Sequence, residues 1–183
     1  MIALARIVWL ATGFVWAARS LVALADPHYW DPVTMLDYVA VWLFTACWLT
    51  LAPSIFLLGR LTLSRAVTVV ASVVAIAALV AGVANGVEDG LDMKWAGIFY
   101  IFGSLTAFLG LLALAFTFRQ ARYARLAWVS AALFIGSLLF NAGGGFVYLI
   151  ALASVAVAPR WFATPGRGAT GEPTSAPDLV VRT

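Results

Sequence analysis

The stretch LAWVSAALFIGSLLFNAGGGFVYLIALASVAVA, Leu126–Ala158, decides how the chain folds, because it is apolar from end to end and contains no charged residue. As one helix, its roughly 33 residues would be about 50 Å long, whereas the hydrocarbon core of a bilayer is about 30 Å thick. The segment Asn141–Gly145 (NAGGG) interrupts it, and consecutive glycines are poor helix formers that allow a tight reversal. We therefore expect two short spans, at about 126–141 and 145–159, joined at the glycines.

Four further apolar runs precede this stretch. With 64% hydrophobic and only 10% charged residues, the chain lies outside the range of soluble domains, in which about 25% of residues are charged. Because lipid cannot satisfy backbone amides, apolar runs of about 20 residues are typical of membrane helices. The runs also lack the period-2 pattern of barrel strands. We expect an all-α, polytopic membrane helix bundle with earlier spans near Ile7–Ala25, Val33–Leu58, Ala66–Val87 and Trp95–Phe118.

The charged residues between the spans fall into two sets. Nine of the 11 Lys and Arg residues lie in one set of loops and in the ends of the chain: Arg6, Arg60, Arg65, Arg119, Arg122, Arg125, Arg160, Arg167 and Arg182. The other set of loops carries six of the eight acids: Asp26, Asp31, Asp37, Glu88, Asp89 and Asp92. Because basic loops stay in the cytoplasm, six transmembrane spans with both termini cytoplasmic are expected. The alternative is five spans plus a re-entrant or interfacial segment, which would place the C-terminal tail outside.

Two domains follow from this pattern. Residues 1–162 form a transmembrane helical domain, and residues 163–183, which mix Pro, Gly, Ser and Thr with scattered charge, are expected to be a disordered cytoplasmic tail. The first span also offers a signal-peptidase pattern at Ala23-x-Ala25. Arg19 and two bulky tryptophans within the span argue against cleavage, which stays an open alternative.

The only histidine, His28, lies in ADPHYWDP, Ala25–Pro32, between the first two spans. Asp31 and Pro32 are favoured residues for the start of the second helix. Carboxylates with one imidazole are reasonable ligands for a divalent cation. No pair has diagnostic spacing, so solvated acidic loops are the favoured interpretation and no cofactor is expected. The weak candidate metal ligands are His28, Asp26, Asp31, Glu88, Asp89 and Asp92.

Arg19 is the most informative single residue, because it lies within the first span. Seven positions separate it from Asp26, which places it about 10 Å below the helix end. A charge at that depth costs up to about 2.5–3.5 kcal/mol. We expect a structural ion pair between Arg19 and Asp37, or failing that with Glu88 or Asp89. The alternative is a side chain that reaches lipid phosphates at the membrane surface.

The sequence contains no recognisable enzyme motif, which disfavours an enzyme. Its single cysteine, Cys47, excludes an intrachain disulfide and any multi-cysteine metal site within the chain. We expect a non-catalytic accessory, assembly or scaffold component of a larger bacterial inner-membrane system, in contact with lipid and with other membrane subunits or copies of itself, and not with nucleic acid. The alternative is a small transporter or channel with an acidic extracytoplasmic vestibule. A third, more distant interpretation is a lipid- or cofactor-handling membrane enzyme.

Overall fold

The structure, a computed structural model, describes residues 2–25, 34–158 and 161. These residues form six α-helices, three short helical turns and no strand. The helices are α1 (Ile2–Ala25), α2 (Met35–Arg60), α3 (Arg65–Asn85), α4 (Gly97–Gln120), α5 (Ala124–Leu138) and α6 (Gly144–Val157), and the turns are η1 (Gly86–Gly90), η2 (Lys94–Ala96) and η3 (Phe140–Ala142). The expected tail, 163–183, and most of ADPHYWDP lie outside the described residues.

The helices differ in length. Four helical segments are each long and apolar enough to cross a membrane, which indicates a membrane protein. They are α1, α2, α3 together with η1, and α4 together with η2. Helices α5 and α6 have only 15 and 14 residues, which corresponds to about 22 Å each. The predicted break at NAGGG is confirmed, since α5 ends before it and α6 begins within it. The two helices that it separates are shorter than a typical span.

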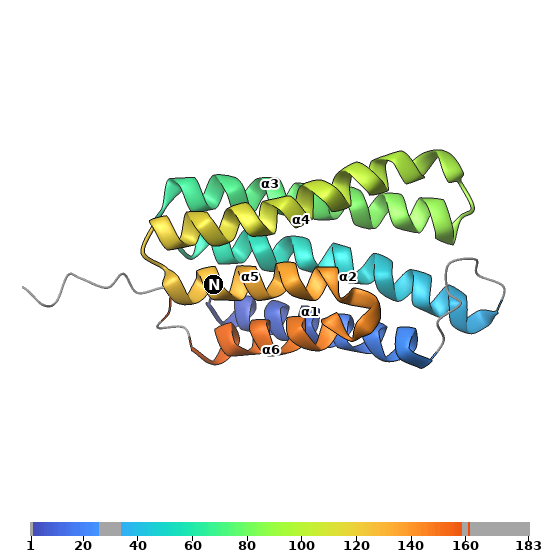
Figure 1. Ribbon diagram of the computed structural model, residues 1–183, viewed down its shortest axis with the longest axis horizontal. Helices are drawn as coiled ribbons and strands as arrows, with labels where there is room; N and C mark the ends of the chain where they lie inside the picture. Colours follow the sequence, from blue (N-terminus) through green and yellow to red (C-terminus); the bar gives the residue numbers. More distant parts are fainter. Residues whose placement is uncertain (1, 26–33, 159–160, 162–183) are drawn as a thin grey trace, which may run out of the picture.

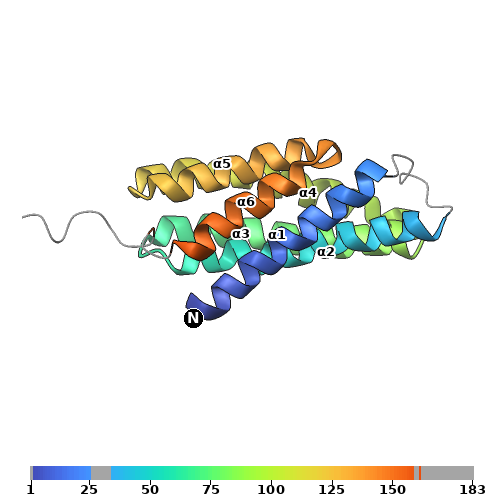
Figure 2. The ribbon, with the colours of Figure 1, turned by 90° about the horizontal axis from the view of Figure 1, so that it is seen from below.

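The six helices form a closed ring. Each helix packs against the next along the chain, and α6 packs back against α1. Helix α1 crosses the others obliquely (Figure 2). One end of the bundle, named here the basic end, carries Arg60, Arg65, Arg119, Arg122 and Arg125. The opposite, acidic end is where α3 and α4 meet, and it carries Glu88, Asp89 and Asp92.

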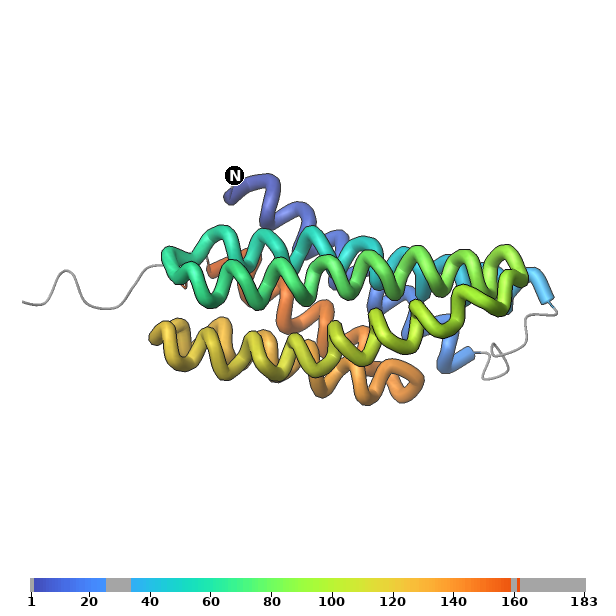
Figure 3. The backbone as a smooth tube through the Cα atoms, turned by 90° about the horizontal axis from the view of Figure 1, so that it is seen from above, coloured from blue at the N-terminus to red at the C-terminus, as the bar shows by residue number. Residues whose placement is uncertain are grey.

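The α5–α6 hairpin begins at the basic end and stops short of the acidic end (Figures 1 and 3). At its tip, the Phe140 ring stacks on Phe44 with 5.4 Å between centroids. Since α2 begins at Met35, the tip lies nine residues, or about 14 Å, inside the start of that helix. Only α1 to α4 therefore continue into the acidic end of the bundle.

The glycines of NAGGG have different tasks in the reversal. Gly143 has φ 90° and ψ 13°, a left-handed conformation that a side chain disfavours. Gly144 and Gly145 allow close packing: an added Cβ would overlap the Gly136 carbonyl oxygen at the first position and the Trp16 carbonyl oxygen at the second. The turn and the seam between α6 and α1 therefore both depend on glycine.

Helix α1 is fixed to α2 by side chains that donate to the backbone of α2. Trp9 Nε1 donates to the Ser54 carbonyl at 3.1 Å, and Trp16 Nε1 to the Cys47 carbonyl at 3.1 Å. The Trp16 ring stacks on Tyr148 of α6, with 3.9 Å between centroids. Because polar groups in a low-dielectric interior must be paired, these bonds allow α1 to bury its indoles without an energetic penalty.

The start of α2 differs from the predicted one. Thr34, and not Asp31, is the N-cap: its side chain accepts from the Asp37 amide, and the Asp37 carboxylate accepts from the Thr34 amide at 2.6 Å. This reciprocal arrangement is a capping box. The Thr-x-x-Asp signal at 34–37 was in the sequence, and the Asp-Pro pair three residues earlier was wrongly preferred.

Candidate functional site

A cavity of about 260 Å³ lies at the acidic end, next to the tip of the α5–α6 hairpin. It is named here the Arg19 cavity, and residues from α1, α2, α3, η1, α4 and η3 line it: Arg19, Ala40, Val41, Phe44, Asn85, Glu88, Asp89, Tyr100, Ile101 and Phe140. The cavity thus exists where four long helices continue and the short hairpin does not. It combines one guanidinium, two carboxylates, an amide and a phenol with apolar walls.

Arg19 is the most deeply placed charge of the cavity, with only 1% of its surface exposed. Its Cζ lies 5.1 Å from the centroid of the Phe44 ring and 5.3 Å from that of Phe140. A guanidinium within about 6 Å of an aromatic face is attracted by the ring quadrupole. The tip of the hairpin and the wall of α2 therefore help to hold this charge inside the bundle.

Glu88 and Asp89 reach the cavity through the turn η1, a π-helical continuation of α3. A π-turn holds one more residue per hydrogen-bonded ring than an α-helix and so rotates the side chains that follow it. Both residues are half-buried. The Glu88 carboxylate lies against Gly97 at the start of α4, where an added Cβ would overlap it. The first residue of α4 thus leaves room for this carboxylate.

Asn85 is the buried polar group next to these acids. It is 2% exposed, and its Nδ2 donates to Thr45 Oγ1 at 3.0 Å. Thr45 lies on α2, so the bond ties the end of α3 to that helix. The Asn85 carboxamide is therefore held in one orientation at the cavity wall.

The predicted ion pair between Arg19 and Asp37 stays a prediction. Both residues are buried at the same end of the bundle, with 1% and 4% of their surfaces exposed. Asp37 accepts hydrogen bonds within its capping box from the Thr34 amide and hydroxyl. The two alternative partners expected for Arg19, Glu88 and Asp89, line the same cavity as Arg19.

The weak candidate metal ligands divide into three groups. Glu88 and Asp89 line the Arg19 cavity. Asp26, His28 and Asp31 lie outside the described residues. Asp92 is exposed, and its Oδ1 lies 3.0 Å from Lys94 Nζ. Within the described part of the chain, no group of three His, Cys, Asp or Glu side chains is placed to hold a metal ion.

Sequence reasoning missed Phe44, Phe140 and Tyr100 as parts of a site. Each lies in an apolar run where an aromatic residue is unremarkable. Four α-helices, α2 to α5, lie between Arg19 and Phe140 in the sequence. Asn85 lies at the end of an apolar run, where nothing in the sequence singles it out either. The one available signal was the hairpin length, since two helices shorter than their neighbours leave a space beside them.

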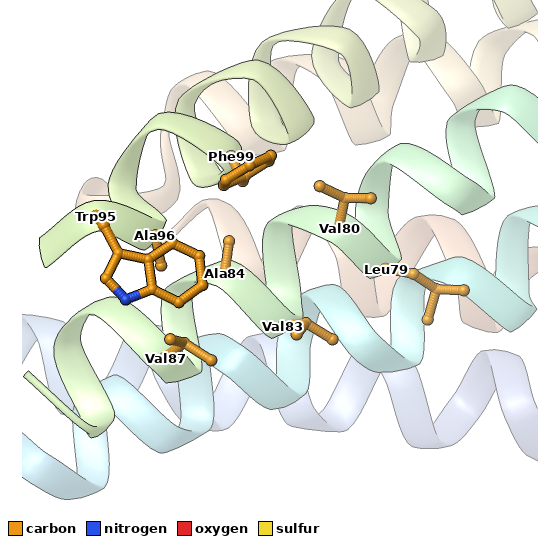
Figure 4. A pocket seen from close by; sticks show the side chains of 8 residues that line it. All are labelled: Leu79, Val80, Val83, Ala84, Val87, Trp95, Ala96 and Phe99. Atoms are coloured by element: carbon orange, nitrogen blue, oxygen red, sulfur yellow. The ribbon is translucent and has the colours of Figure 1, made fainter. Parts of the chain in front are cut away.

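A second, apolar groove of about 410 Å³ lies between α3 and α4, on the surface of the bundle. Trp95 and Phe99 line one side, and Val80, Val83 and Val87 line the other (Figure 4). No charged side chain lines it. Such a surface suits contact with acyl chains or with another apolar helix, and it offers no group for chemistry.

The chain matches no protein-family model, and neither the curated proteins nor the solved structures compared with it give a match. The distinctive element of this chain is the Arg19 cavity, which can bind groups of either charge through Arg19 on one side and Glu88 and Asp89 on the other.

Proposed function

We propose that the protein is a non-catalytic integral membrane protein that acts as an accessory, assembly or scaffold component of a larger system in a bacterial inner membrane. The observation that carries the proposal is the uncovered face of α4. This helix buries seven of its 24 residues, whereas α2 buries 12 of 26. Along the half of α4 near the acidic end, the short hairpin provides no neighbour, which leaves a place for a helix of another subunit.

The uncovered half of α4 is apolar and carries large side chains. Ile98, Phe102 and Leu105 are each more than half exposed. A membrane helix gains from van der Waals packing when another helix replaces lipid along such a face. A subunit bound there would complete the ring at the level where α5 is missing.

The proposal includes a topology. Helices α1 to α4 cross the membrane, and the α5–α6 hairpin enters and leaves at the basic end, in place of the six full crossings expected from the charge pattern. The helix lengths support this arrangement, since about 22 Å is short for a hydrocarbon core of about 30 Å. Both arrangements leave both termini in the cytoplasm, because the basic end faces that side under the positive-inside rule.

Photo-crosslinking in intact cells tests the proposal. A photoreactive residue at Phe102, which is 63% exposed on α4, is expected to give one defined protein adduct. The matched control is the same residue at Ile150, which is 71% exposed on α6 and is expected to give lipid adducts only. Lipid adducts alone at both positions would contradict a subunit at the uncovered half of α4.

The second candidate is a small transporter or channel, and one observation favours it: Glu88 and Asp89 line a cavity near the acidic end. Acidic side chains at a pore entrance attract cations. Purified protein in liposomes tests this candidate by cation flux. Flux that is lost in the double variant Glu88→Gln, Asp89→Asn would favour the transporter or channel over the accessory role. The absence of flux above that of empty liposomes would favour the accessory role.

A further inference from the structure

The Arg19 cavity holds charges of both signs within one small volume. Arg19 lies on one wall, and Glu88 and Asp89 lie on another. A ligand of one charge would meet repulsion from part of the lining. A zwitterion, with an anionic and a cationic group a few bonds apart, matches both parts.

The chemistry of Arg19 selects the anionic group. Guanidinium presents five N–H donors in a planar fork that fits phosphate oxygens two at a time. This number of donors also lets Arg19 serve a ligand and a group of its own chain together. Its neighbours Phe44 and Phe140 keep the guanidinium within the cavity wall, with Cζ 5.1 and 5.3 Å from their centroids.

The carboxylates select the cationic group. A quaternary ammonium is bound on aromatic faces, but Arg19 already lies over the rings of Phe44 and Phe140, and the third lining ring, Tyr100, packs at 72° against Phe44. A primary ammonium instead carries three N–H donors, and Glu88 and Asp89 provide the carboxylate acceptors. The lining therefore favours a primary amine over a trimethylated one.

The rim and the size of the cavity indicate how such a ligand arrives. Ile101 lines the cavity and is 60% exposed on the uncovered half of α4, next to further exposed apolar side chains such as Phe102. A volume of about 260 Å³ is below the roughly 300–1,000 Å³ of sites that enclose whole drug-sized molecules. A polar headgroup fits inside while acyl chains lie against the apolar surface outside.

We propose that the Arg19 cavity binds a phosphoethanolamine group, with the phosphate at Arg19 and the ammonium at Glu88 and Asp89, supplied by phosphatidylethanolamine that enters sideways from the membrane. This inference does not rest on the proposed accessory function, since a bound lipid requires no protein partner, although both proposals place an occupant against the uncovered half of α4. A crosslink to a partner at Phe102 and a lipid headgroup in the cavity can each be found without the other.

Native mass spectrometry of the full chain in detergent tests the proposal. The protein is mixed with equal amounts of phosphatidylethanolamine, phosphatidylcholine and phosphatidylglycerol that share the same acyl chains. One phosphatidylethanolamine per protein is expected, retained about tenfold over each competitor, because a lost charged hydrogen bond corresponds to about a factor of ten or more. Equal retention of the three lipids would overturn the proposal.

Variants test which residues bind the phosphate and which bind the ammonium. Arg19→Gln is expected to lose the tightly bound lipid about tenfold. Glu88→Gln with Asp89→Asn is expected to remove the preference for phosphatidylethanolamine over phosphatidylglycerol while lipid binding persists. The control is Arg119→Gln at the basic end, where Arg119 lines a different cavity, and its lipid profile is expected to equal that of the unmodified protein.

The acidic double variant keeps the proposal falsifiable if Arg19→Gln fails to fold, since a preference unchanged in that variant overturns the assignment. A further arm adds free phosphoethanolamine to the lipid-loaded protein. Failure to displace the lipid supports a membrane source. Displacement at equal concentration, together with equal retention of the three lipids, overturns the lipid source and assigns the same chemistry to a soluble ligand.

Discussion

The two halves of the bundle differ in how many helices enclose them. In the half near the basic end, all six helices meet around a sealed core in which Leu58, Phe118 and Leu126 have no exposed surface. In the half near the acidic end, only α1 to α4 continue, and the polar Arg19 cavity takes the place of the missing hairpin. The comparison teaches that the length of one hairpin, and not a change in overall composition, separates the packed half from the open half.

Gly145→Ala disturbs the packing of the half near the basic end and is expected to have the largest effect on stability. Its Cβ would overlap the Trp16 carbonyl oxygen and lie 2.5 Å from Ser20 Oγ, so α6 must move away from α1. Overpacking of this kind costs about 1–3 kcal/mol, occasionally more. The midpoint of thermal unfolding in detergent is expected to fall by the corresponding amount. The control is Gly97→Ala, whose Cβ has the end of the Glu88 side chain, and no backbone atom, as its nearest neighbours, and an equal fall there would show that the two halves are equally tight.

Ala40→Cys probes the open half chemically. Ala40 is only 2% exposed but lines the Arg19 cavity, through which a reagent can reach it, whereas the native Cys47, two turns further along α2, is not among the lining residues and has no exposed surface. Thiol modification requires access as well as a thiolate. With a small polar thiol reagent, the variant is expected to gain one adduct and the unmodified protein none, as read by intact mass. Adducts in both proteins, or in neither, would remove the distinction between the halves.

Thr45→Val weakens the contact between α2 and α3 at the wall of the Arg19 cavity. It removes the acceptor of the Asn85 amide while keeping the side-chain shape, and a buried donor left unpaired costs about 1–3 kcal/mol. A fall of about 1 kcal/mol in the free energy of unfolding is expected from denaturation in detergent. Thr50→Val is the matched control, because Thr50 Oγ1 donates to the Ala46 carbonyl of its own helix, and the change in this variant should be clearly smaller.

Lys94→Gln is expected to have the smallest effect. Lys94 and Asp92 form an ion pair at the tip of the acidic end, with 71% and 85% of their side chains exposed. Exposed pairs contribute little, because water and salt screen them. The unfolding midpoint is expected to be unchanged at low and high salt. A salt-dependent fall would mean that the open half is held together by its charges.

Much of the fold could be predicted, because its signals are local. The glycines of NAGGG mark a reversal in any apolar run, and the alternation of basic and acidic loops places helix ends together. The start of α2 was missed although Thr34 and Asp37 carry a capping signal, since the neighbouring Asp-Pro pair carries a similar one. The π-turn η1 has no comparable signal, because a single extra residue in a helical ring leaves no trace in hydrophobic periodicity.

Less of the candidate site could be predicted, because it depends on contacts between distant segments. Arg19 is conspicuous as a charge in an apolar helix, and this alone predicts an acidic partner or a contact with lipid phosphates. Its aromatic neighbours Phe44 and Phe140 could not be chosen from among the other aromatic residues. The contact with Phe140 depends on how far the α5–α6 hairpin reaches, which the packing of Gly145 against α1 helps to fix.

The contact between Arg19 and Phe140 has a consequence for biosynthesis. Arg19 is synthesised 121 residues before Phe140. At about 5–20 residues per second, on the order of ten seconds pass between the synthesis of the two residues. During that interval Arg19 lacks the Phe140 ring that later covers it, so we expect a variant at Arg19 to change membrane insertion and a variant at Phe140 to change only the finished bundle.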